Sequence, residues 1–255
     1  MKSVEVIIPI YNEEKTIKNQ VIKLRKFFDN VIGKKNWNFI FIDNGSTDNS
    51  RKILEKIIKS NDRYFYKQIP NYGVALREGI INCNSDYAFI CDIDQWDLPF
   101  FSWCWAYRKK FDYIVGSRRS DPTINKAPLL RKVLTLGLNI MITILFNYMG
   151  TDTHGPKFVN MKRIKNTAKK VISRRGQFDT ELLIRLSRGG FKIAEAPIKH
   201  FEIRKNKFPI IKKILWNIYA LIKMYFFLKK IKWKKKVYFN QFCRDDVLKI
   251  YNKNI

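Results

Sequence analysis

Apolar runs and amphipathic segments alternate along the first 120 residues. Four runs rich in β-branched and aromatic residues predict strands at residues 4–10, 37–43, 63–69 and 86–94. Between them, apolar positions recur at helical spacing, which predicts helices over residues 16–28, 51–60 and 74–83. Strands that alternate with helices at this interval predict an α/β fold, with a Rossmann-like, mostly parallel sheet and helices on both of its faces.

Polar and turn-forming residues follow each predicted strand. The four strands run in order into PIYNEE, IDNGSTD, PNYG and CDIDQWD. In open parallel sheets, ligands bind outside the carboxyl ends of the strands. Since all four polar segments fall at that edge, the sequence predicts a ligand site there.

The segment CDIDQWD places three carboxylates within six residues. In one interpretation Asp92, Asp94 and Asp97 are turn and helix-cap residues, which is a common use of aspartate. In the other, Asp92 and Asp94 reach a hard divalent cation that is shared with substrate phosphates. Their position at the end of the fourth strand favours the second interpretation for this pair.

Two later segments concern membranes. Residues 133–151 carry no charge and border on spanning length, but their Asn and Gly residues favour a buried or interfacial helix over a span. Residues 208–236 combine lysine-rich flanks with one apolar helical stripe, formed by Ile211, Leu215, Ile218, Ile222 and Tyr225. This pattern predicts an amphipathic helix in the headgroup layer of an anionic membrane, with a core helix that bears a lysine face as the alternative.

The charge balance points to polyanionic partners. Lys and Arg number 50 against 22 acidic residues, a formal net charge of +28. Nucleic acid, an anionic membrane and phosphorylated substrates would all fit. The nucleic-acid interpretation rests on charge alone, because the sequence matches no recognised binding module. In addition, the carboxylates at the strand ends would repel a polyphosphate. We therefore expect no nucleic-acid partner, and the absence of a secretory signal predicts a protein on the cytoplasmic side.

Taken as a set, three motifs carry a family resemblance. VIIPIYNEE, IDNGSTD and the Asp-x-Asp of CDID resemble the nucleotide-sugar half of glycosyltransferase family 2, whose inverting enzymes have the GT-A fold. GSRRS (116–120), TDTHGPKFV (151–159) and QFDTELLIRLSRGGFKIAEAPI (177–198) are similar to the polyprenyl-phosphate hexosyltransferase branch, which includes dolichyl-phosphate mannose and glucose synthases.

The resemblance implies a domain organisation. It extends to about residue 205 and implies a GT-A domain over 1–205, with a nucleotide-sugar half in 1–120 and an acceptor half in 121–205. Residues 206–255 would then be a basic, amphipathic segment whose interfacial helices associate with the membrane.

The resemblance also implies a donor site. The residues that would border the nucleotide are Pro9, Tyr11, Asn12, Glu13, Asp43, Gly73, Asp92 and Ile93. Mg²⁺ or Mn²⁺ would be held by Asp92, Asp94 and Gln95, with Asp94 as the direct ligand. The synthases carry their Gln one position later, where this chain has Trp96.

The mechanism depends on whether the acceptor is a lipid phosphate or a sugar hydroxyl. A lipid phosphate is already an anion and needs cations to position it, for which Arg118, Arg131 and Arg204 are candidates. The resemblance places Arg118 and Arg204 at the family's phosphate-binding positions, and it places His154 in a loop that would touch the acceptor or the diphosphate. A sugar hydroxyl instead needs a carboxylate base. Asp179 or Glu181 would supply that base, but residues two apart do not share one helix face, so we expect only one of them to point at the site.

The resemblance implies an inverting, metal-dependent glycosyltransferase. It would move a hexose from a GDP- or UDP-linked sugar to a polyprenyl or dolichyl phosphate, as a peripheral enzyme at the cytoplasmic face of a membrane. The alternative acceptor is a sugar hydroxyl of a glycan or a lipid-linked glycan. A membrane-anchoring partner subunit is compatible with both.

Overall fold

The sheet is the centre of the molecule. The computed structural model describes residues 3–121, 129–199, 210–231 and 237–253, excluding the side chains of 129–131 and 210–214. Eight strands form one sheet in the order β3-β2-β1-β4-β6-β5-β7-β8. The strands are β1 (Val4–Ile10), β2 (Trp37–Asp43), β3 (Arg63–Tyr66), β4 (Tyr87–Ile90), β5 (Tyr113–Ser117), β6 (Lys157–Asn160), β7 (Lys192–Pro197) and β8 (Tyr238–Gln241). All neighbouring pairs are parallel except those that β6 makes with β4 and β5.

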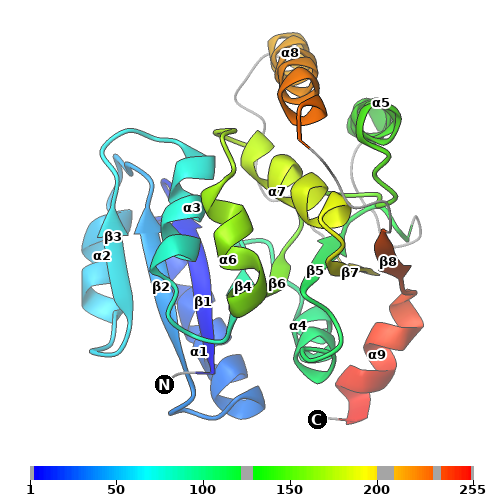
Figure 1. The fold of residues 1–255 in the computed structure, drawn as a ribbon. Helices are drawn as coiled ribbons and strands as arrows, with labels where there is room; N and C mark the ends of the chain where they lie inside the picture. Colours follow the sequence, from blue (N-terminus) through cyan, green and yellow to red (C-terminus); the bar gives the residue numbers. More distant parts are fainter. Residues whose placement is uncertain (1–2, 122–128, 200–209, 232–236, 254–255) are drawn as a thin grey trace.

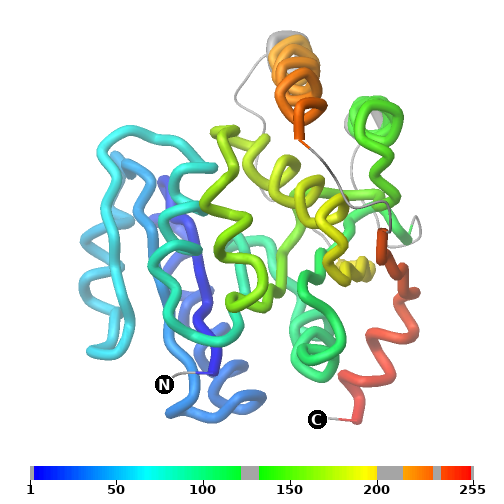
Figure 2. Tube along the Cα trace, viewed as in Figure 1, coloured from blue at the N-terminus to red at the C-terminus, as the bar shows by residue number. Residues whose placement is uncertain are grey.

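Helices cover both faces of the sheet (Figures 1 and 2). One face packs against α1 (Ile17–Val31), α2 (Ser50–Ile57), α4 (Leu98–Ala106) and α9 (Arg244–Lys253). The other packs against α3 (Tyr72–Asn82), α5 (Leu129–Phe146), α6 (Met161–Lys169), α7 (Gln177–Arg188) and α8 (Ile210–Lys229). Side chains of β2 alternate between the two cores, Phe39 and Phe41 in one and Ile40 and Ile42 in the other, as the strand period requires. The predicted α/β fold is thus confirmed.

Two predicted strands end earlier than expected. β3 stops at Tyr66 rather than at residue 69, because its partner strand β2 ends at Asp43, opposite Tyr66. β4 stops at Ile90, and the chain then turns so that Gln95 N–H donates to the Asp92 carbonyl at 3.1 Å. Asp92 and Asp94 therefore lie on a tight turn beyond the strand rather than within it.

The C-terminal residues return to the sheet. β8 pairs with β7 in parallel, and α9 packs against α4, with the Phe242 ring 4.8 Å from that of Trp103. Residues 238–253 thus belong to the same layers as the rest of the fold, whereas we expected all of 206–255 to form a separate membrane segment. Among the described residues of that segment, α8 alone keeps the expected combination of exposed apolar side chains and lysines.

Helices α5 and α8 pack against one another at one end of the molecule, at the top of Figure 1. The helix predicted near 133–151 is α5, which begins and ends earlier. Among the described side chains of α8, Leu221, Met224 and Leu228 are buried, while Leu215 and Ile222 of the predicted stripe are exposed. Across the described ranges, no helix is both long and apolar enough to cross a bilayer.

Candidate functional site

The loops after β1 and β2 interlock at the carboxyl edge of the sheet. Thr47 N–H donates to the Asn12 side-chain oxygen at 2.8 Å, and Asn12 N–H donates to Ser46 Oγ at 3.1 Å. Glu13 N–H donates to Ser50 Oγ at 2.6 Å. Asn12 adopts a left-handed conformation, φ 56°, which asparagine tolerates better than most residues. These bonds fix the two motifs of the predicted nucleotide site against each other.

Asp43 closes the loop after β2. Its carboxylate accepts bonds from Ser46 N–H at 2.9 Å and from the Tyr64 hydroxyl at 3.0 Å. Burial and the charge of Asp43 raise the pKa of Tyr64, so the phenol stays protonated and donates. Pro9 is buried in β1, and Tyr11 is exposed just beyond that strand. The predicted nucleotide residues thus gather at one edge, and their contact with a nucleotide stays a prediction.

Asp92 and Asp94 lie on the turn that follows β4, whereas Asp97 lies at the start of α4. Ile93 is fully buried, and the Trp96 indole N–H donates to its carbonyl at 3.1 Å. Asp97 caps α4 by accepting a backbone N–H of the first turn at 2.9 Å, so the helix-cap interpretation holds for this residue. Trp96 therefore closes the turn where the synthases carry Gln, and Gln95 is the polar neighbour of Asp92.

Asp92, Asp94 and Gln95 suit a hard divalent cation in the chemistry of their donor atoms. Carboxylate and amide oxygens are the ligands that Mg²⁺ and Mn²⁺ prefer. Within the described part of the chain, His, Cys, Asp and Glu form no group of three or more that could hold a metal by itself. Water or oxygen atoms of a bound substrate would complete the coordination shell of a metal held by this turn.

Tyr72 brings the β4 turn together with the acceptor half. Burial raises its pKa well above the ordinary value, and the carboxylates of Asp92 and Asp179 raise it further, as does a hydrogen bond with Asp92. The charge of Arg118 opposes this shift. The phenol therefore stays protonated. It lies among the predicted metal ligand Asp92, the predicted base Asp179 and the predicted phosphate-binding residue Arg118. The next residue, Gly73, is buried.

Arg118 and Asp152 form a bidentate ion pair. Arg118 Nε and Nη2 donate to the two carboxylate oxygens at 2.7 and 2.9 Å. Burial opposes the charge of Asp152, but Arg118 outweighs it and holds the pKa of this carboxyl well below its usual range. Although burial disfavours the guanidinium charge as well, the paired carboxylate raises the pKa of Arg118. The arginine is thus held in one orientation.

His154 is fixed at the rim of the site. Its Nε2 lies 2.9 Å from the Gly176 carbonyl, which can only accept, so Nε2 carries a hydrogen. In the neutral ring, Nδ1 then accepts from the Thr153 hydroxyl at 2.8 Å, and Thr153 in turn contacts Thr180 at 3.0 Å. His154 therefore ties the loop before β6 to the loop before α7.

The two candidate bases have different surroundings. Lys157 Nζ donates to Asp179 at 2.9 Å, and both side chains are at most 2% exposed. Glu181 accepts from Arg185 Nε at 2.6 Å and from two backbone N–H groups of the loop before α7. Glu181 thus holds that loop on α7, while Asp179 is the carboxylate near Tyr72 and His154.

Two predicted site residues are not described by the structure, and three site residues of the structure were not predicted from the sequence. Arg204 lies outside the described residues, and Arg131 lies in α5 with its side chain outside them. Conversely, Tyr72, Asp152 and Lys157 were missed as site residues. Tyr72 stands in the PNYG turn, and the other two in the TDTHGPKFV motif, so the motifs carried the signal. Their pairing with partners far away in the sequence did not show in any local pattern.

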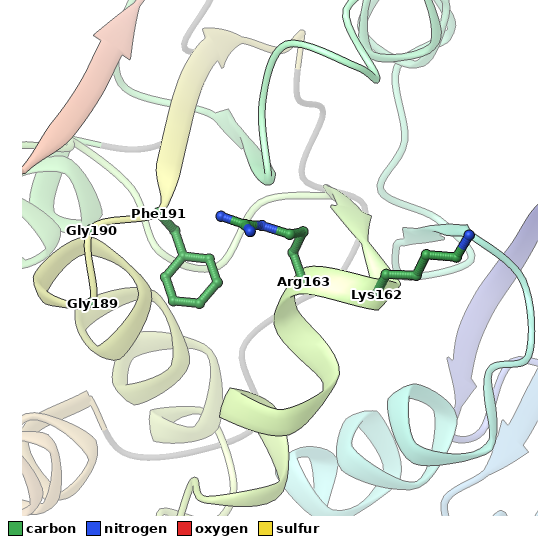
Figure 3. Close-up of a pocket in the computed structure, with 5 residues that line it drawn as sticks. All are labelled: Lys162, Arg163, Gly189, Gly190 and Phe191. Carbon is green, nitrogen blue, oxygen red and sulfur yellow. The ribbon is translucent and has the colours of Figure 1, made fainter.

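A shallow hollow lies at the opposite edge of the sheet (Figure 3). Its two cations are already paired, Arg163 Nε with Asp112 at 3.1 Å and Lys162 Nζ with Asp86 at 2.8 Å. Asp112 and Asp86 directly precede β5 and β4, so this hollow faces away from the carboxyl edge. Its lining residues are Lys162, Arg163, Gly189, Gly190 and Phe191.

Comparisons with known proteins identify the family. The family model described as "Glycosyl transferase family 2" matches residues 5–140. The UDP-N-acetylglucosamine–dolichyl-phosphate N-acetylglucosaminyltransferase of Methanococcus voltae is 29% identical over 227 residues, 78% of this chain and 85% of that relative. The dolichyl-phosphate β-glucosyltransferase of Saccharomyces cerevisiae is 25% identical over 232 residues, 79% of this chain and 68% of that relative.

A solved structure supports the fold. Glucosyl-3-phosphoglycerate synthase from Mycobacterium tuberculosis, crystallised with Mn²⁺, UDP-glucose and phosphoglyceric acid, superposes with a TM-score of 0.63 at 17% identity. The match covers 88% of this chain and 80% of that one. The three motifs, the two-faced α/β sheet and the family match lead to one conclusion: the chain belongs to glycosyl transferase family 2, and it is a glycosyltransferase of the GT-A fold with dolichyl-phosphate sugar transferases among its relatives.

Proposed function

We propose that the protein transfers a sugar, with inversion, from a UDP-linked donor to the phosphate of a polyprenyl lipid at a membrane surface. The relatives named above support a dolichyl-phosphate acceptor, and one of them names a UDP-linked sugar as its donor. The site supports the same reaction, because it joins a pair of carboxylates suited to a metal with a fixed arginine around Tyr72.

On the donor side, Asp92 and Asp94 would hold Mg²⁺ or Mn²⁺, with Gln95 beside them. The ion, when bound, neutralises the charge that grows on the leaving diphosphate. The interlocked loops around Asn12 and Asp43 would hold the nucleotide, since their backbone positions are fixed by hydrogen bonds between the two motifs. Tyr72 stays protonated and orients Asp92.

The observation that carries the acceptor assignment is the Lys157–Asp179 pair. A sugar hydroxyl would need Asp179 as a base, but one of its oxygens already accepts a hydrogen bond from the buried ammonium of Lys157, 2.9 Å away. Arg118 keeps its charge through Asp152, and its Nη1 makes no hydrogen bond within the described ranges. A phosphate acceptor uses this arginine and needs no base.

Exposed apolar side chains on α5 and α8 support membrane association. We call this surface the apolar face; it consists of Val133, Leu136, Ile140 and Ile144 on α5 and of Leu215, Trp216, Tyr219, Ile222, Phe226 and Phe227 on α8. Exposed Lys223 and Lys229 accompany it on α8, and exposed Lys230 directly follows the helix. Apolar and aromatic side chains beside lysines suit the headgroup layer of an anionic membrane, and the cytoplasmic face stays a prediction.

The test compares Arg118→Ala with Asp179→Asn. With UDP-sugar, Mn²⁺ and a short-chain polyprenyl phosphate in micelles, we expect the arginine variant to lose about tenfold to a hundredfold in kcat/KM for the acceptor. Asp179→Asn should lose less, since no proton has to be removed. Thermal melts confirm that each variant folds. A nearly unaffected Arg118→Ala beside an inactive Asp179→Asn, or a wild type that glycosylates a sugar hydroxyl instead, would contradict the proposal.

A further inference from the structure

The loop between α6 and α7 connects the candidate site with the apolar face. On the site side, Arg175 N–H donates to the Asn71 side chain at 3.0 Å, and the Gly176 carbonyl accepts from His154 at 2.9 Å. On the other side, the loop leads into α7, which lies beneath α8 in Figure 1. There the Gln177 side chain donates to that of Asn217 at 2.8 Å. The loop is therefore fixed between the two regions.

Arg175 holds the loop in an unusual conformation. Its φ is 56°, in the left-handed region that residues other than glycine seldom adopt. The approach to α3 is close, because a Cβ on Gly73 would lie 2.5 Å from the Arg175 carbonyl oxygen. A strained residue of this kind persists only where the surroundings fix it, and such residues cluster at functional sites.

The Arg175 guanidinium stands at the boundary between the site and the apolar face. Its Cζ lies 5.4 Å from the centre of the Trp216 ring, and Trp216 belongs to the apolar face. The side chain is exposed and makes no hydrogen bond or ion pair within the part of the chain that the structure describes. Its neighbour Arg174 is also exposed but has no such ring contact there. Arg175 is thus an oriented cation whose donors are available to a ligand.

We propose that Arg175 binds the phosphate of the lipid acceptor where that phosphate passes from the membrane to the site. The inference rests on the proposed function and extends it to a residue outside the family motifs. Trp216 would lie at headgroup depth with the rest of the apolar face and hold the guanidinium over its ring. A guanidinium fork matches phosphate oxygens in a bidentate arrangement, which a lysine cannot reproduce.

The experiment measures acceptor kinetics in detergent micelles free of phospholipid, at saturating UDP-sugar and Mn²⁺. For Arg175→Ala we expect the KM for polyprenyl phosphate to rise about tenfold, with kcat and the donor KM changed less than about twofold. Arg175→Gly, which accepts the left-handed backbone, should show the same rise. Arg175→Lys should restore part of the affinity. Arg174→Ala, the matched control, removes the same charge one residue away and should leave the acceptor KM within about twofold of the wild type.

Several outcomes would overturn the inference. Equal effects of Arg175→Ala and Arg174→Ala would mean that only net charge matters. A normal acceptor KM in micelles, together with weaker binding to phospholipid vesicles, would identify the ligand as a phospholipid headgroup rather than the acceptor. If the wild type bound the donor but glycosylated no polyprenyl phosphate, both the proposed function and this inference would be wrong. The assay of the wild type shows that outcome before any variant is made.

Discussion

Asp94 lies on the turn after β4, in a position to meet a donor that binds at the carboxyl edge of the sheet. We predict that Asp94→Ala abolishes the Mn²⁺-dependent rise in melting temperature that UDP produces, while the melting temperature without ligand changes little. The reason is that a ligand stabilises only the state that binds it. The measurement is a thermal-shift titration of UDP with and without Mn²⁺.

The control is Asp86→Ala. Asp86 carries the same charge and is paired with the exposed Lys162 at the opposite edge. It should keep the full metal-dependent shift. A shift of wild-type size in Asp94→Ala would remove this residue from the metal site.

The pair of Arg118 and Asp152 should also contribute to stability. Arg118→Ala leaves a carboxylate that is only 3% exposed without its partner, so we expect the free energy of unfolding to fall by about 3 kcal/mol at pH 7. Urea denaturation of both proteins at several pH values measures the loss.

The pH dependence of that loss has a defined sign. Because the folded-state pKa of Asp152 is lowered, its stabilising contribution is complete above the unfolded carboxyl value, about 3.9, and disappears as the pH falls through the folded value. In Arg118→Ala the buried carboxyl takes up a proton more readily, so the difference in stability between the two proteins should shrink as the pH falls from about 4 toward the folded value of the wild type. A constant difference over that range would contradict this explanation.

At the scale of elements, β8 and α9 complete the sheet. Ending the chain after residue 237 would remove Phe242 and Val247 from the core and uncover Trp103. Burying one large apolar side chain contributes about 1.5–3 kcal/mol, so we predict a truncated protein that is strongly destabilised or insoluble. Circular dichroism melts and the soluble yield measure this.

The role of β8 and α9 in the sheet limits the use of truncations in membrane-binding experiments. Deleting residues 208–255 would remove α8 together with β8 and α9, and the loss of membrane binding could then reflect unfolding. Point substitutions on the exposed side of α5 or α8 avoid this problem. A truncation after residue 237 with an unchanged melt would mean that β8 and α9 are dispensable.

The sequence predicted the N-terminal half of the fold better than the rest. β1 and β2 were predicted over their full lengths, because each is a seven-residue buried run ending in turn residues. β6 and β8 were not predicted, since each has four residues, and their pairing partners, β4 and β7, lie far away along the chain. In the site, Asp92 and Arg118 could be proposed from motifs. The partners that orient them, Tyr72 and Asp152, came only from the three-dimensional structure.

At the scale of the whole molecule, the apolar face predicts where the protein meets lipid. Replacing both Ile140 and Ile144 by Ser removes two side chains that are 49% and 76% exposed. We expect a loss of about 2–3 kcal/mol in membrane binding, hence a partition into anionic vesicles that is weaker by about 30-fold to 150-fold. Co-sedimentation with vesicles of defined composition measures this.

A matched control lies on the other side of the sheet. Ile22 on α1 is 55% exposed, and α1 covers the opposite face of the sheet from α5 and α8. Ile22→Ser removes one exposed isoleucine, against two in the double variant, and should leave vesicle binding unchanged. Equal losses in both proteins would show that the apolar face is not the docking surface.

The position of α8 between β7 and β8 has a practical consequence. Both ends of this helix lead into neighbouring strands that pair in register, from Lys192 opposite Tyr238 to Glu195 opposite Gln241. A helix held in this way stays close to α5 whether or not lipid is present, because the closed segment keeps its local concentration high. The apolar face therefore remains exposed when the enzyme is in water. We expect the enzyme to self-associate reversibly as its concentration rises, and to become monodisperse when a mild detergent covers the apolar face.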